Sequence, residues 1–231
     1  MILPSAKYYI LTGNYGSGKT ELAISLALRL RRETGGRVAL VDLDIVNPYF
    51  RSAEQKALLE ADGVEVFMPS FALSTVDIPA LPANIHGIFQ QDYAHVVIDL
   101  GGDDTGAAAL GRYHPFLEPV RAQTQVFYVV NPLRPLSGTE EDILALFSLI
   151  ESRARIRPDM LVNNANLQRQ TTPQDLLDAQ ALLEKVSARL HLPIGMVVGE
   201  ERLFHTLPAE MQAIFFPLRP VMKPEWLEDL P

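Results

Sequence analysis

The sequence of 231 residues contains no cysteine, and this absence excludes several kinds of function at once. Without a thiol, the chain can form no disulfide, no thiolate metal site and no persulfide. Long apolar runs are missing too, because no segment approaches the roughly 20 apolar residues that a membrane-spanning helix needs. The N-terminus also lacks a basic stretch followed by a cleavable apolar run, so we expect a cytoplasmic protein.

Basic residues are in deficit, since 20 Lys and Arg stand against 28 Asp and Glu and give a formal net charge of −8. Such a chain has no general electric field that would attract nucleic acid or anionic lipid, so we expect neither as a direct partner. The five histidines show no spacing that indicates a zinc site. With 48% hydrophobic residues, we expect one globular domain over residues 1–231.

Short β-prone segments alternate with amphipathic segments along the chain. The patterns predict strands at residues 8–12, 38–41, 64–68, 95–100, 125–130, 160–163 and, as the last one, 194–198. They predict helices at residues 19–32, from Ser52 to near Gly63, around 143–150 with Ser137 and Glu140 as a cap, and at 172–190. The fold class is therefore expected to be α/β, with a mainly parallel sheet and helices on both faces.

The strongest local signal is a run of eight residues that matches G-x-x-x-x-G-K-[ST] in full: Gly13, Asn14, Tyr15, Gly16, Ser17, Gly18, Lys19 and Thr20. It lies between a predicted strand and a predicted helix. Glycines let several backbone N–H groups turn inward on phosphate oxygens, and the helix N-terminus adds partial positive charge. We expect Lys19 to reach the β- and γ-phosphates and the Thr20 hydroxyl to ligate Mg²⁺. The motif predicts a site for a Mg-bound nucleoside triphosphate.

Acidic residues stand where two predicted strands end. Asp42 and Asp44 follow one strand and Asp99 closes another, so all three can lie beside the glycine-rich loop in a parallel sheet. Asp42 and Asp99 are candidate Mg²⁺ ligands or acceptors for Mg²⁺-bound water, whereas solvent-exposed strand ends are the alternative. Gly102 follows soon after Asp99, and its backbone could approach the γ-phosphate as a switch.

Taken together, these motifs resemble the MinD/ParA-like class of P-loop ATPases, in the same order over most of the chain. The resemblance implies a P-loop NTPase fold and a catalytic set of Lys19, Asp44 and Asp99, in which Asp44 positions the attacking water and Asp99 serves Mg²⁺. It also implies that the purine is read after a late strand, at Asn163 and Asn164, with further base contacts around residues 199–202.

The chain departs from this class at three places. The signature lysine that reaches across a nucleotide-bound dimer is replaced by Asn14, and the paired cysteines of cluster carriers are absent. The C-terminal residues 223–231 are short and acidic, unlike a basic membrane helix. We therefore expect slow turnover and, if a homodimer forms, weak ATP-dependent association. A compensating charge could come from Arg51 or Arg112, and Arg134 is similarly placed after a strand.

Base preference and function follow from the same motifs. Guanine-specific P-loop proteins carry Asn-Lys-x-Asp where this chain has Asn163, Asn164, Ala165 and Asn166, and an amide accepts only one of the two guanine hydrogen bonds well. We expect ATP and Mg²⁺ as ligands, in a Mg-dependent ATPase that acts as a nucleotide-driven switch for a protein partner. The alternatives are an ATP-dependent kinase or ligase for a small-molecule acceptor, or a nucleotide-binding module without hydrolysis.

Overall fold

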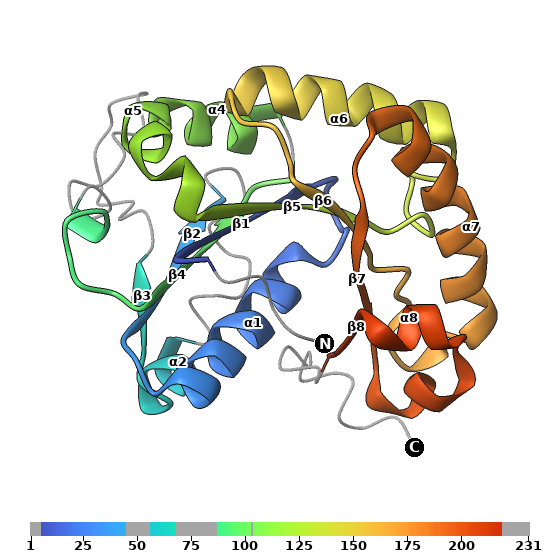
Figure 1. The fold of residues 1–231 in the computed structure, drawn as a ribbon, viewed down its shortest axis with the longest axis horizontal. Helices are drawn as coiled ribbons and strands as arrows, with labels where there is room; N and C mark the ends of the chain where they lie inside the picture. The colour runs from blue at the N-terminus through green and yellow to red at the C-terminus, as the bar shows by residue number, and fades with distance from the viewer. Residues whose placement is uncertain (1–5, 45–55, 68–86, 103, 219–231) are drawn as a thin grey trace, which may run out of the picture.

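The computed structural model describes residues 6–44, 56–67, 87–102 and 104–218, and within them eight parallel strands form one sheet (Figure 1). Their order across the sheet is β3-β2-β4-β1-β5-β6-β7-β8. The strands are β1 (Tyr8–Gly13), β2 (Val38–Leu43), β3 (Val64–Phe67), β4 (His95–Leu100), β5 (Thr124–Val130), β6 (Met160–Asn163), β7 (Ile194–Gly199) and β8 (Phe215–Pro217). The prediction of a parallel α/β fold is confirmed.

Helices cover both faces of this sheet (Figure 1). One face carries α1 (Lys19–Thr34) and α2 (Lys56–Ala61), whereas the opposite face carries α4 (Asp104–Arg112), α5 (His114–Leu117) and α6 (Glu140–Ala154). The half of the sheet that contains β6 to β8 packs against α7 (Pro173–Leu190) and α8 (Ala209–Ala213). Three 3₁₀ helices complete these connections: η1 (Glu118–Gln123), η2 (Gln168–Gln170) and η3 (Glu201–Thr206).

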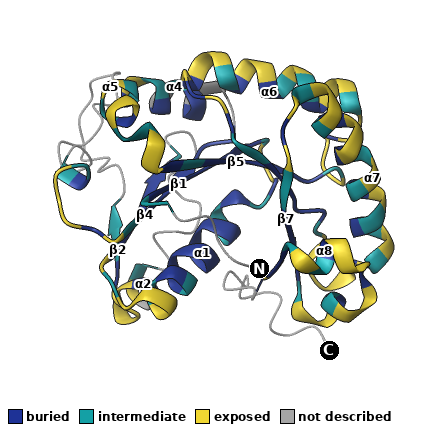
Figure 2. Cartoon of the chain, viewed as in Figure 1, coloured by how far each residue is buried: buried dark blue, intermediate teal, exposed yellow. Residues whose placement is uncertain are grey.

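The central strand β1 is buried at every position (Figure 2). Its side chains alternate between two separate cores. Tyr8 and Ile10 pack with residues of α4 and α6, while Tyr9 and Leu11 pack with residues of α1. Burying one such side chain stabilises the fold by roughly 1.5–3 kcal/mol. This double burial holds the end of β1, and the loop that follows it, in a fixed place.

Several elements differ from the sequence prediction. Strand β7 is not the last strand, because the three residues of β8 pair beside it, and so short a segment leaves no periodic signal. Helices α4, α5 and α8 were not predicted. Helix α6 is capped by Thr139, whose side chain accepts a hydrogen bond from Asp142 N, and not by Ser137. The predicted start of a helix at Ser52, like the candidate Arg51, lies outside the described residues.

The strand order brings the predicted functional segments to one edge. Strand β4 lies between β1 and β2, with Asp99 aligned to Leu11 on one side and to Asp42 on the other. Residues 13–20, called the phosphate loop below, connect β1 to α1 at this same edge. No helix in the described residues is long and apolar enough to cross a membrane.

Candidate nucleotide site

Three glycines give the phosphate loop its shape. Gly13, Gly16 and Gly18 have φ angles of 145°, 72° and 85°, a region that side chains other than glycine rarely adopt. A Cβ on Gly13 would lie 2.1 Å from the carbonyl oxygen of Val129 on β5, and one on Gly18 would lie 2.4 Å from Asn164 Nδ2. The loop can therefore follow this path, against these neighbours, only with glycine at these positions.

Lys19 is buried inside the phosphate loop although it carries a charged group. Its Nζ donates a hydrogen bond of 2.7 Å to the backbone oxygen of Asn14 and lies 3.5 Å from Ser17 Oγ. The loop backbone closes further through a bond from Ser17 N to the same Asn14 oxygen. The ammonium group is thus held against atoms of the loop, and an anion could exchange for these contacts.

Next to Lys19, the ends of β2 and β4 place two carboxylates side by side. Asp42 and Asp99 are only 7% and 2% exposed, and Asp42 Oδ1 accepts a hydrogen bond of 2.8 Å from Asp44 N. Burial, reinforced by the negative charge of Asp42, raises the pKa of Asp99 to about 7, whereas Lys19 and a hydrogen bond from Thr20 oppose this shift. A cation at this point would relieve the repulsion between the two carboxylates.

The oxygen atoms at the site fit a Mg²⁺ ion that is also bound by phosphate. Asp99 Oδ1 is buried and has no hydrogen-bond partner among the described residues, while the Thr20 side chain contacts the same carboxylate. Hydroxyl and carboxylate oxygens are the ligands that Mg²⁺ prefers. Within the described ranges, no three His, Asp or Glu side chains form a metal cluster on their own. Phosphate and water oxygens would have to supply the rest.

The segment after β4 rests directly on the phosphate loop. A Cβ on Gly102 would lie 2.5 Å from both the nitrogen and the Cα of Tyr15. Gly101 is enclosed between Asp44, whose Oδ1 would be 3.2 Å from a Cβ there, and Gly106 of α4. Two successive glycines therefore connect the acidic strand end to the phosphate loop by backbone contact alone.

Asn14 uses its side chain for a purpose that the sequence did not indicate. Its Nδ2 donates to the backbone oxygen of Pro135 at 2.9 Å and to Ser137 Oγ at 2.8 Å. Both acceptors belong to residues 131–139, the β5–α6 loop. Its Oδ1 accepts a hydrogen bond from Tyr15 N, while the Tyr15 side chain is exposed. Asn14 thus fastens the β5–α6 loop to the phosphate loop.

The two asparagines at the end of β6 point to different places. Asn164 Nδ2 donates a hydrogen bond of 2.6 Å to the backbone oxygen of Ser17, so this residue contacts the phosphate loop. Asn163 is fully buried and its Nδ2 donates to the backbone oxygen of Leu176 and to Gln180 Oε1, both on α7. Of the two predicted base contacts, only Asn164 is brought to the site.

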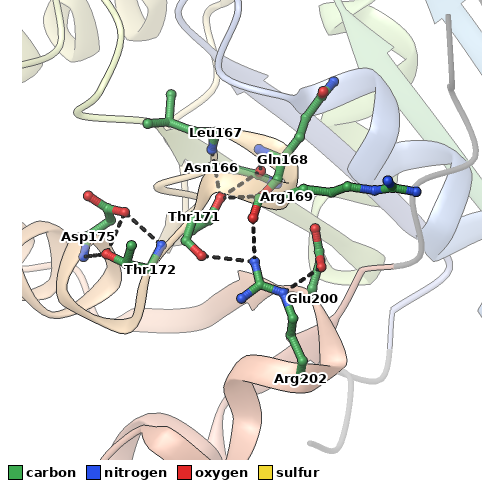
Figure 3. A network of polar contacts seen from close by, with 9 residues as sticks. All are labelled: Asn166, Leu167, Gln168, Arg169, Thr171, Thr172, Asp175, Glu200 and Arg202. Carbon is green, nitrogen blue, oxygen red and sulfur yellow. Dashed lines mark hydrogen bonds and ion pairs between the residues drawn. The ribbon is translucent and has the colours of Figure 1, made fainter. Parts of the chain in front are cut away.

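Beyond Asn164, a polar network joins the loops after β6 and β7 (Figure 3). The Arg202 guanidinium donates to the backbone oxygens of Arg169 and Thr171 at 3.0 and 2.9 Å and pairs with Glu200 at 2.8 Å. Residue Asn166 lies in the same network, and its Oδ1 accepts from Gln168 N at 2.6 Å and from the Thr171 hydroxyl at 3.3 Å. The loop after β6 therefore has a defined conformation.

Asn131, a residue that sequence reasoning missed, ties this network to the centre of the site. Its Nδ2 donates to the backbone oxygen of Asn166 at 3.0 Å, and its Oδ1 accepts from Leu133 N. The available signal was its position, since a polar residue directly follows β5 at the same sheet edge as the phosphate loop. The loops after β5, β6 and β7 consequently form one connected rim.

Comparison with known proteins gives likeness of fold at low sequence identity. No protein-family model and no curated protein sequence matches the chain. Among solved structures, cell division protein FtsY from Thermotoga maritima is similar with a TM-score of 0.57 and 19% identity, over 87% of this chain and 65% of that one. FlhF complexed with GTP and Mg²⁺ is similar with a TM-score of 0.52 and 18% identity, over 83% and 65%.

A third similar structure is that of the signal recognition particle receptor FtsY from Elizabethkingia anophelis in complex with GDP. Its TM-score is 0.55 at 16% identity, over 88% of this chain and 60% of that one. This chain thus spans 60 to 65% of the length of the three proteins. These likenesses do not single out the MinD/ParA-like class that the motifs resemble. Together with the parallel sheet and the phosphate loop, they identify the fold as that of a P-loop NTPase.

Proposed function

We propose that this chain is a Mg-dependent nucleoside triphosphatase whose phosphate loop holds the nucleotide and whose 101–102 segment responds to the γ-phosphate. One observation carries the proposal. Lys19 is held inside a loop shaped by positive-φ glycines, opposite the buried Asp99, whose Oδ1 has no partner within the described part of the chain. A buried cation and a buried, unpartnered carboxylate oxygen are costly to maintain unless a ligand contacts both.

Each residue then has a defined task. Lys19 exchanges its bond to the Asn14 carbonyl for a phosphate oxygen, and the loop N–H groups and the N-terminus of α1 surround the remaining phosphate charge. Thr20 and Asp99 hold Mg²⁺ or its water, and when bound the ion neutralises charge that develops on the β- and γ-phosphate oxygens. Asp44, next to Gly101, orients the attacking water.

We assign adenine as the preferred base because of Asn166. Its Oδ1 already accepts two hydrogen bonds from its own loop, so the group left for a ligand is the Nδ2 donor. The guanine edge offers donors at N1 and N2, whereas adenine offers an acceptor at N1. A protein donor that faces the N1 position therefore complements adenine and opposes guanine.

Guanine is the competing assignment, because FlhF and one of the FtsY proteins were solved with guanine nucleotides. Calorimetric titration of the chain with Mg-ATP and Mg-GTP separates the two bases. We expect tighter binding of ATP and a shift of preference toward GTP in Asn166→Asp, which supplies the carboxylate that guanine favours. Equal affinities in the wild-type chain would remove the assignment of the base and leave the phosphate site intact.

Hydrolysis itself is measured as ADP release from Mg-ATP by the isolated chain. We expect slow release that needs no acceptor molecule and rises when a protein partner is added, as in a nucleotide-driven switch. Release that occurs only with a small-molecule acceptor would identify a kinase or ligase. Binding without any ADP release, even in single-turnover reactions, would identify a module that only binds nucleotide.

Two expectations from the sequence stay predictions: that residues 1–231 form one domain, and that the protein is cytoplasmic.

A further inference from the structure

The β5–α6 loop carries an arginine that the proposed reaction does not yet use. Arg134 lies over the phosphate loop, since a Cβ built on Gly16 would be 3.8 Å from Arg134 Cδ and 3.9 Å from its Nε. These are ordinary van der Waals distances, so the arginine stem lies against the loop at Gly16. Arg134 is exposed and forms no salt bridge with any residue in the described ranges.

The backbone around Arg134 is fixed relative to the phosphate loop. Arg134 N donates to the backbone oxygen of Asn131 in a tight turn, and Pro135 restricts the residue before it to extended conformations. On the far side, Asn14 holds both Pro135 and Ser137 through its side chain. A long cationic side chain is thus mounted on a rigid loop whose anchor is itself part of the phosphate loop.

The balance of charge around the phosphate loop favours a further cationic residue such as Arg134. The charged groups that act on buried Asp99 are one cation, Lys19, and two further acids, Asp42 and Asp44. A nucleoside triphosphate brings about four negative charges and Mg²⁺ returns two, so further positive charge stabilises the bound state and the transition state.

We propose that Arg134 binds the nucleotide phosphates from within the same chain and is a further catalytic residue of the site. This inference rests on the proposed nucleoside triphosphatase function. Asn14, whose side chain is neutral, holds the loop that presents Arg134. Hydrolysis then requires no closed dimer, because the charge comes from the β5–α6 loop of the same molecule.

The test compares Arg134→Gln and Arg134→Lys with the wild-type chain and with Arg153→Gln, a matched change of an exposed arginine on α6. Mg-ATP affinity is measured by calorimetry and ADP release in single turnover. We expect Arg134→Gln to lower the hydrolysis rate by at least about ten-fold, and the lysine variant to recover part of it. Melting temperatures should equal those of the wild-type and Arg153→Gln chains, because the side chain is exposed.

A mixing experiment tests the single-chain origin of the charge. Arg134→Gln and Lys19→Ala are combined in equal amounts, so that a site with an intact loop can meet an intact arginine only across two molecules. We expect no recovery of ADP release, and recovery would overturn the assignment to one chain. If Arg134→Gln binds and hydrolyses Mg-ATP within two-fold of an active wild-type chain, the role of Arg134 is overturned and the proposed nucleoside triphosphatase function is not. A wild-type chain that binds no nucleotide would overturn the proposed function with it.

Discussion

Replacing Gly102 with alanine tests the contact between the segment after β4 and the phosphate loop. The new Cβ would lie 2.5 Å from Tyr15 N and Cα and 2.9 Å from the carbonyl carbon of Asn14, all of them backbone atoms that cannot rotate away. Ordinary contacts begin at 3.4 Å, so the two segments must separate by about 0.9 Å, the difference between 3.4 and 2.5 Å. The substitution therefore displaces backbone on one or both sides of the phosphate site.

The size of the effect follows from that displacement. Overpacking of this kind costs about 1–3 kcal/mol, which lowers the melting temperature of a domain of this size by roughly 2–12 °C. A misplacement near 1 Å in a catalytic site lowers the rate by about 100-fold. We therefore expect Gly102→Ala to remain folded and to bind ADP, but to hydrolyse Mg-ATP about 100-fold more slowly in single-turnover assays.

Gly87→Ala is the matched control, because among the described residues its Cβ would meet only the flexible end of Gln91, at 3.5 Å. Its hydrolysis rate should equal that of the wild-type chain. If Gly102→Ala also hydrolyses Mg-ATP at the wild-type rate, the segment after β4 does not respond to the γ-phosphate. The proposed role of residues 101–102 as a switch would then be wrong.

Three further substitutions address the acids and the anchor. Asp44→Asn should bind Mg-ATP normally and hydrolyse it at least about 100-fold more slowly, since an amide orients the attacking water poorly; a wild-type rate would remove Asp44 from the catalytic set. Asp99→Asn should stabilise the nucleotide-free chain at pH 8 by on the order of 2–4 kcal/mol. Burial raises the pKa of Asp99 from 3.8 to about 7, so ionisation of this carboxyl destabilises the folded state, and the amide avoids that cost. That difference in urea unfolding should shrink as the pH falls from 7 toward 4, and a constant difference would contradict the raised pKa. Asn14→Ala should leave the buried core intact but release the β5–α6 loop, so proteolysis within residues 131–139 should become faster, and unchanged cleavage would show that its two side-chain hydrogen bonds do not hold the loop.

Local patterns were sufficient to predict that Lys19, Asp42 and Asp99 lie together. The motif around Lys19 fixes both a backbone shape and a chemical role within eight residues, and continuous apolar runs mark the strands that end at Asp42 and Asp99. Because all strands in the sheet are parallel, their carboxyl ends meet at one edge. Sequence reasoning could therefore bring these residues together without knowledge of the full strand order.

Long-range contacts could not be predicted in the same way. The acceptor of the Asn14 side chain, Ser137, is 123 residues away, so no local pattern connects them, and Ser137 looked like a helix cap. Asn163 and Asn164 are neighbours at a strand end, where successive side chains point to opposite faces. The sequence alone did not show which of the two reaches the phosphate loop. The structure turns Asn163 toward α7 and brings Asn164 to Ser17.

The most direct test of the central claim is calorimetric titration of the wild-type chain, Lys19→Ala and Lys185→Ala with Mg-ATP. Lys185 is an exposed lysine on α7 and controls for the loss of one positive charge. The account predicts one binding site per chain in the wild type, the same affinity in Lys185→Ala, and a loss of at least about 100-fold in Lys19→Ala with its circular dichroism spectrum unchanged. Wild-type affinity in Lys19→Ala would contradict the claim that the phosphate loop holds the nucleotide.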